Sequence, residues 1–117
     1  MNQPLVSHRF PYIRLTVELR GTVHTVDALL DTGFDGDIVL PPDMIGAGLP
    51  PDSELRCRLA DDSEVMAPLY FGAVRVLGSE DTPAIILALG NEVIVGLGVS
   101  NRFSITLDHG QRVVVEP

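Results

Sequence analysis

The chain has 117 residues, about the size of one domain, and 45% of them are apolar, so it can bury a hydrophobic core without disulfide or metal cross-links. Its net charge is −8, and its eight cationic side chains are arginines scattered along the sequence, which disfavours binding to nucleic acid. Cys57 is the single cysteine, which excludes an internal disulfide and predicts a buried structural thiol rather than a reactive one.

The chain is predicted to begin with a β-hairpin. Residues 12–19 alternate polar and apolar side chains with a period of two, which is typical of a half-buried strand. Gly21 provides a turn, and residues 23–30 form the second strand. The end of this second strand leads directly into residues 31–33, Asp-Thr-Gly.

The middle of the chain is predicted to hold a short strand and a second hairpin. Residues 38–40 are an apolar run that two prolines stop, and residues 42–47 allow one or two turns of helix because proline is tolerated in a first helical turn. Residues 56–60 and 64–67 flank the polar group Asp-Asp-Ser at 61–63, which is a pattern typical of a hairpin.

The last third of the chain adds strands and little helix. Strands are predicted over residues 69–77, 84–89, 93–95, 104–107 and 112–115, with a short helix over 99–103. The runs at 84–89 and 93–95 are continuously apolar, which favours strands buried on both faces. Many short strands separated by turns indicate an all-β barrel or sandwich, and no linker or repeat divides residues 1–117, so we expect a single domain.

The candidate site lies at the end of a buried strand, where the chain places the carboxylate of Asp31. Ala28-Leu29-Leu30 precedes Asp31, and burying a carboxylate is costly unless its charge is shared or hydrogen-bonded. Thr32 offers a hydroxyl group, and Gly33 lets the backbone bend tightly and donate its N–H nearby. Taken alone, the triplet also fits an ordinary turn, because Asp and Gly are common turn formers.

Two ordered segments resemble the retropepsin-like aspartic proteases (clan AA), and most closely their prokaryotic single-domain members. The first is Asp-Thr-Gly with its flanks, residues 28–41, and the second is Val-Ile-Val-Gly-Leu-Gly at 93–98, followed by residues 102–110. The resemblance covers about residues 15–115. It implies an all-β fold, a closed barrel-like retropepsin structure with one or two short helices, and an aspartic-type endopeptidase activity.

The resemblance also assigns roles to individual positions. The implied catalytic residues are Asp31, Thr32 and Gly33, and the implied substrate-binding residues are Phe34, Ala60, Asp61, Asp62, Ser63, Ile94, Val95 and Gly96. Ile94, Val95 and Gly96 would pack behind the catalytic loop, and residues 56–67 would form the flap, a hairpin that closes over substrate. Two features depart from the retroviral pattern: Phe34 replaces a small residue, and the flap tip contains no glycine.

The mechanism implied by the resemblance needs two carboxylates, and this chain has one Asp-Thr-Gly. We therefore expect a two-fold homodimer that brings Asp31 close to its symmetry mate, with one proton shared between two like charges. The loop at 31–33 and the chain ends near residues 4–10 and 113–117 are predicted to form the interface, because 113–115 has the pattern of a strand that needs a partner. No metal ion and no cofactor are needed.

Other interpretations of these residues remain. A catalytically silent dimer of the same fold would bind a peptide or serve regulation, and a monomeric all-β module would only bind. The carboxylates that begin at Asp31 do not fit a calcium-binding loop of the helix–loop–helix kind. Such a loop needs glutamate at its twelfth position, and Pro42 stands there when Asp31 is counted as the first. His8, His24 and His109 lack ligand spacing.

The sequence also bears on where the protein acts. Residues 1–10 lack a basic region followed by an apolar run, and the most apolar stretch, residues 83–99, is interrupted and too short to span a membrane. We expect a cytoplasmic protein that acts on a peptide or protein substrate.

Overall fold

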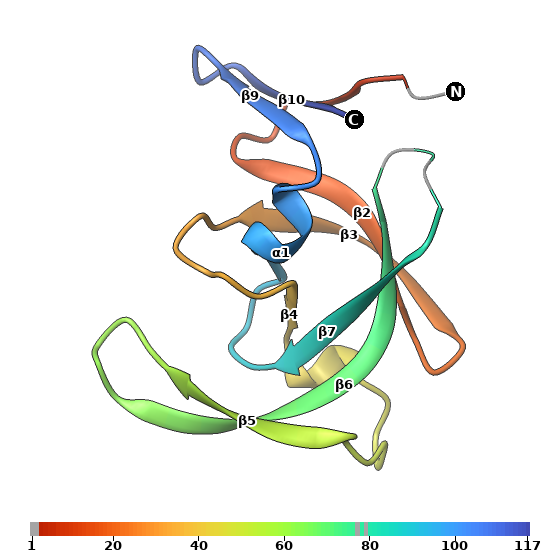
Figure 1. The fold of residues 1–117 in the computed structure, drawn as a ribbon, viewed down its shortest axis with the longest axis vertical. Coiled ribbons are helices and arrows are strands. Elements are labelled where there is room, and N and C mark those ends of the chain that lie inside the picture. Colours follow the sequence, from red (N-terminus) through yellow and green to blue (C-terminus); the bar gives the residue numbers. More distant parts are fainter. Residues whose placement is uncertain (1–2, 77, 79) are drawn as a thin grey trace.

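The computed structural model describes residues 3–76, 78 and 80–117. These residues form ten strands, one 3-10 helix and one short α-helix (Figure 1). The elements are β1 (Leu5–Ser7), β2 (Tyr12–Leu19), β3 (Thr22–Leu30), β4 (Ile38–Leu40), η1 (Pro42–Met44), β5 (Ser53–Arg58), β6 (Glu64–Val76), β7 (Thr82–Ala88), β8 (Ile94–Val95), α1 (Leu97–Ser100), β9 (Ser104–Asp108) and β10 (Arg112–Glu116).

The larger sheet closes on itself. Its strand order is β2-β3-β8-β4-β7-β6-β5, and a further pairing between β2 and β6 joins the first six strands into a barrel. β5 remains outside the barrel and forms a hairpin with β6 that projects away from it (Figure 1). A three-stranded sheet, β1-β10-β9, lies at the opposite end of the molecule from this hairpin.

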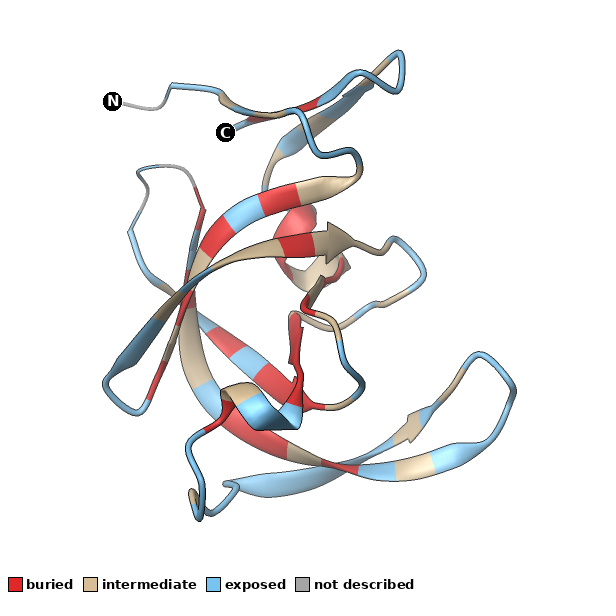
Figure 2. Ribbon diagram, turned by 180° about the vertical axis from the view of Figure 1, so that it is seen from behind, coloured by how far each residue is buried: buried red, intermediate tan, exposed pale blue. Residues whose placement is uncertain are grey.

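Apolar side chains from the barrel strands form the main hydrophobic core. The apolar positions of β2, from Ile13 to Leu19, are at most 3% exposed, as the period of two predicts. Ile38 and Leu40 of β4 and Ile86 of β7 pack against them in the main core. Figure 2 shows this contrast, since buried residues concentrate on the barrel while β5 is exposed along most of its length.

Several boundaries differ from those predicted, and β5, for example, covers Ser53–Arg58 rather than residues 56–60. Residues 64–67 and 69–77 are not two strands: β6 runs unbroken through Pro68 up to Val76, and Leu77 lies outside the described residues. Proline is tolerated there because β7 pairs with β6 only from Leu69 onward, so one side of Pro68 has no ladder partner. The expected helix at 42–47 is a single 3-10 turn, η1, and the helix expected at 99–103 occupies Leu97–Ser100.

Two expectations were wrong, one about the burial of β7 and one about the pairing of β10. β7 is not buried on both faces throughout, because Ile85 is 42% exposed beside the exposed Phe71 of β6. Likewise β10 needs no partner from another chain: β1 and β9 flank it on both sides. The edges of the small sheet are therefore β1 and β9, and an interface at the chain ends stays a prediction that rests on those edges instead.

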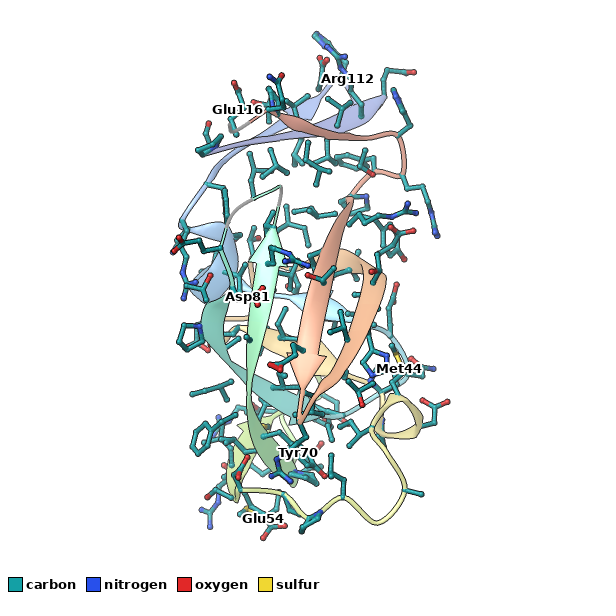
Figure 3. All side chains as sticks on the ribbon, turned by 90° about the vertical axis from the view of Figure 1, so that its right-hand side faces the viewer. Met44, Glu54, Tyr70, Asp81, Arg112 and Glu116 are labelled. Atoms are coloured by element: carbon teal, nitrogen blue, oxygen red, sulfur yellow. The ribbon has the colours of Figure 1, made fainter. Side chains whose placement is uncertain are left out.

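One ion-paired carboxylate links the barrel to the hairpin end of the molecule. Asp52 Oδ2 accepts a hydrogen bond from the Phe71 N–H at 2.9 Å, and Oδ1 lies 3.0 Å from the Arg20 guanidinium, which also stacks over the Tyr70 ring. Tyr70 is labelled in Figure 3, at the same end of the molecule as Glu54. The bond from Phe71 and the charge of Arg20 hold the pKa of Asp52 below its usual range.

This contact predicts a loss of stability in acid. A lowered pKa means that Asp52 binds a proton more weakly in the folded state than in the unfolded chain. Its contribution to the stability of the fold is therefore fully present above the ordinary Asp pKa of about 3.9. This contribution is lost as the pH falls through the lowered pKa of the folded state. In thermal melts from about pH 5 to about pH 2, Asp52→Asn should therefore show a shallower decline in Tm than the wild type. Glu54→Gln is the control, because Glu54 makes no hydrogen bond or ion pair in the described structure; equal slopes for the wild type and Asp52→Asn would contradict the prediction.

Candidate active site

Asp31 is fixed by the strand that precedes it. The Leu29 N–H donates to the Val93 carbonyl oxygen at 2.9 Å, and the Asp31 N–H donates to that of Val95 at 3.1 Å. These bonds extend the parallel pairing of β3 with β8 by one residue into the loop. The backbone of Asp31 is thus held inside the sheet, while its side chain is half-buried at the barrel surface.

The loop after Asp31 folds back on the carboxylate. The Gly33 N–H donates to Asp31 Oδ1 at 2.8 Å, and the Phe34 N–H donates to the Asp31 carbonyl oxygen at 3.2 Å. Within the described residues, no protein group donates to Oδ2, so one carboxylate oxygen is fixed and the other is free to bind water or a second carboxylic acid. Thr32 and Gly33 are exposed beside it.

The second predicted segment holds this loop from behind. The N–H groups of residues 96–98 donate to the carbonyl oxygens of Asp37, Phe34 and Gly36, each at 2.9 Å. A Cβ atom at position 96 would lie 2.6 Å from the Phe34 carbonyl oxygen, and it would also overlap the carbonyl oxygen of Gly36. Only glycine allows this close approach of two backbones, which explains why the sequence carries glycine after Ile94-Val95.

A groove of about 600 Å³ opens beside Asp31. Its apolar lining belongs to a small second core, in which Phe34 and Ile94 pack against Val39 and Leu87. The lining residues are Asp31, Gly33, Phe34, Asp35, Val39, Leu55, Arg56, Cys57, Arg58, Leu59, Leu87, Leu89, Gly90, Asn91, Glu92 and Ile94. The groove thus runs between the loop that follows Asp31, the β5 strand and the loop that joins β7 to β8.

The structure brings some of the predicted substrate-binding residues to the groove and leaves others away from it. Phe34 and Ile94 line it, whereas Val95, which is 1% exposed, and Gly96 are buried behind the loop. The flap residues Ala60, Asp61, Asp62 and Ser63 form the exposed tip of the β5–β6 hairpin and are not among the lining residues of the single chain.

The tip is a defined turn rather than a flexible glycine loop. The Leu59 N–H donates to the Ser63 carbonyl oxygen at 2.8 Å, and Asp62 has a φ of 72°. The Asp61 carboxylate accepts hydrogen bonds from the N–H and hydroxyl of Ser63, and these bonds lower its pKa. Asp62 also pairs with Arg58 at 3.3 Å.

Cys57 belongs to the groove, which the sequence did not indicate. Its side chain is half-buried against the second core, and burial raises the pKa of the thiol. A raised pKa keeps the thiol protonated and weakly nucleophilic. The expectation of an unreactive structural thiol therefore fits its surroundings, although the side chain is only partly buried.

Two further observations concern the described residues only. No three His, Cys, Asp or Glu side chains among them come together in a group that would hold a metal ion. None of the helices that they form has the length and apolar character needed to cross a membrane.

The closed six-stranded barrel, with the Asp-Thr-Gly loop held against Ile94-Val95-Gly96, defines a retropepsin-like fold. A retropepsin-like aspartic protease from Rickettsia conorii superimposes with a TM-score of 0.63 and 15% sequence identity, covering 99% of this chain and 90% of that one. The protease of Simian Foamy Virus (mac) gives a TM-score of 0.49 and 20% identity over 73% of this chain and 88% of that chain. No model of a protein family and no curated protein matches the sequence. The likeness to the Rickettsia structure confirms the predicted all-β retropepsin-like fold.

Proposed function

We propose that the chain is an aspartic endopeptidase that acts as a homodimer, with one Asp31 from each subunit in a shared site. The observation that carries this proposal is the position of Asp31 at the edge of a groove of about 600 Å³, with one carboxylate oxygen held by the Gly33 N–H and the other free. Such a groove is large enough to bury several side chains of an extended peptide.

In this mechanism the two carboxylates share one proton. The ionised Asp31 takes a proton from a bound water molecule, whose oxygen forms a bond to the scissile carbonyl carbon, while the protonated Asp31 donates to the carbonyl oxygen. The Asp31 that took the proton from water then gives it to the leaving nitrogen as the C–N bond breaks, and the other Asp31 takes back a proton from a hydroxyl group of the tetrahedral intermediate. The products are a carboxylate and an amine, and no covalent enzyme intermediate forms.

The dimer is proposed because one chain supplies one such carboxylate. Thr32 and Gly33 are exposed next to Asp31, so a two-fold axis near this loop would place the two carboxylates together. The edges β1 and β9 of the small sheet expose Val6 and Leu107, which are 42% and 50% exposed, and offer a second contact region near the chain ends.

Two measurements test this proposal: the oligomeric state of the protein and its cleavage of peptides. Sedimentation at tens of micromolar should show a dimer, and a diverse peptide library incubated between about pH 3 and about pH 7 should yield cleavage products that Asp31→Asn does not produce. A chain that remains monomeric, or cleavage that survives in Asp31→Asn, would overturn the proposal.

A silent dimer that binds peptides without cutting them is the second candidate, and the flap tip favours it. The bonds within Asp61–Ser63 and from Arg58 to Asp62 stiffen the turn that would have to move over a substrate. A dimer that binds library peptides but releases no products identifies this second function.

Phe34 is expected to limit the size of the substrate side chain beside it. The half-buried Phe34 ring covers Gly36 and Gly96 and forms part of the groove wall. Phe34→Ala should broaden the cleavage preference towards larger substrate side chains. It should lower the free energy of unfolding by less than the ~3–5 kcal/mol typical of replacing a fully buried phenylalanine. Library profiling and urea unfolding measure both effects; an unchanged cleavage profile in a folded variant would rule out this role.

A further inference from the structure

A glutamate stands in the wall of the groove and is held there by a tyrosine. Glu92 lies in the loop between β7 and β8, lines the groove and is half-buried. The Tyr12 hydroxyl donates a short hydrogen bond to Glu92 Oε1, although the two residues are 80 positions apart. This bond fixes the direction of a carboxylate that would otherwise extend freely from a loop.

Tyr12 is itself firmly placed. It begins β2, opposite Leu29 of β3, two residues before Asp31. The Arg9 guanidinium lies over its ring at 4.9 Å and binds Asp27 at 3.1 Å. The hydrogen bond to Glu92 raises the pKa of Tyr12, so the hydroxyl remains a donor over the whole range in which the protein would act.

Among the residues that the structure describes, Glu92 has no ion-pair partner. The two arginines that line the groove come from the opposite wall, β5, where Arg58 is already bound to Asp62 at 3.3 Å and Glu64 at 3.6 Å. Asp35 adds an exposed carboxylate to the lining, close in sequence to Asp31.

We propose that Glu92, positioned by Tyr12, selects substrates that carry an arginine or lysine side chain beside the scissile bond. This inference rests on the proposed peptide-binding groove. Leu89 and Ile94 flank Glu92 in the lining and would cover the aliphatic stem of a long basic side chain, while the carboxylate receives its charged head. The free Oε2 is the acceptor, because Oε1 is taken by Tyr12.

The experiment compares arginine with its uncharged isostere. A library peptide that the protein cleaves, or that it binds if none is cleaved, is resynthesised with arginine, citrulline or glutamate at each position in turn. Where the peptide is cleaved, kcat/KM is measured for the wild type, Glu92→Gln and Tyr12→Phe. Glu54→Gln is the control, because it removes the same charge from an exposed position outside the groove lining. Binding of the same peptides to Asp31→Asn, followed by fluorescence anisotropy, gives a readout that needs no catalysis.

At one position we expect the wild type and Glu54→Gln to prefer arginine to citrulline by roughly tenfold, a typical gain from a charged hydrogen bond. Glu92→Gln should lose this preference, and Tyr12→Phe should reduce it while retaining cleavage. If nothing is cleaved but Asp31→Asn binds the arginine peptide selectively, the inference stands and the endopeptidase proposal fails. If neither assay shows a preference, or if the preference persists in Glu92→Gln, the inference is overturned.

Discussion

Replacing Asp31 with asparagine is expected to abolish peptide cleavage while leaving the dimer at least as stable as the wild type at neutral pH. Two carboxylates held together repel when both are ionised, so the dimer retains a proton that separated chains release. Because the folded dimer binds more protons than the unfolded chains, the stability contributed by the pair is lost as the pH rises. Asparagine keeps the shape and the Oδ1 acceptor for Gly33 but removes the repulsion.

Melting temperatures at about pH 4 and about pH 7, at equal protein concentration, measure this effect. The advantage of Asp31→Asn over the wild type should be larger at the higher pH. Asp43→Asn is the matched control, since Asp43 is exposed in η1 and outside the groove lining. A clear loss of stability in Asp31→Asn at neutral pH would show that Asp31 does not belong to a carboxylate pair.

Gly96→Ala is expected to cost both stability and activity. The added methyl group would overlap the backbone of Phe34 and Gly36, so the catalytic loop would have to move away from residues 96–98. Overpacking of this kind typically costs about 1–3 kcal/mol, and here the displaced atoms are backbone, which relaxes less readily than a side chain. Because the displaced loop carries Asp31, kcat should fall even where the variant remains folded.

Gly46→Ala provides the comparison for that variant. Position 46 is exposed, and a Cβ there would meet nothing within 4 Å, so the change should alter the free energy of unfolding by no more than about 0.5–1 kcal/mol. Urea unfolding and peptide cleavage of both variants separate the close contact at Gly96 from a general effect of losing glycine. Equal stability and equal cleavage activity in Gly96→Ala and Gly46→Ala would mean that the loop carrying Asp31 tolerates displacement.

The features that the sequence predicts are those encoded locally. The alternation in β2 follows from the period of two, and the delivery of Asp31 to the barrel surface follows from the strand β3 that ends there. The packing of Ile94-Val95-Gly96 behind the loop was expected from a resemblance, and it holds for Val95 and Gly96, whereas Ile94 lines the groove. In the structure, a backbone contact too close for any Cβ provides its physical reason.

The features that the sequence could not predict depend on distant partners. The contact of Tyr12 with Glu92 joins the first barrel strand to the loop between β7 and β8, and no local pattern relates two residues that lie 80 positions apart. Pro68 signals a strand break locally, but the switch of β6 from β5 to β7 at that point removes the conflict. Cys57 reaches the groove because β5 folds over the second core, a packing fact that no spacing of cysteines encodes.

The pairing of β1 with β10 has a consequence for how the protein is made. Leu5 pairs with Val115, so the N-terminal strand leaves the ribosome long before its partner exists. The barrel closure between β2 and β6 is likewise non-local. Folds dominated by such pairings fold slowly, in roughly milliseconds to seconds, because distant segments must meet before any stabilisation is gained. The exposed strand edges of the nascent chain are therefore open to other chains until β10 has been synthesised and pairs with β1.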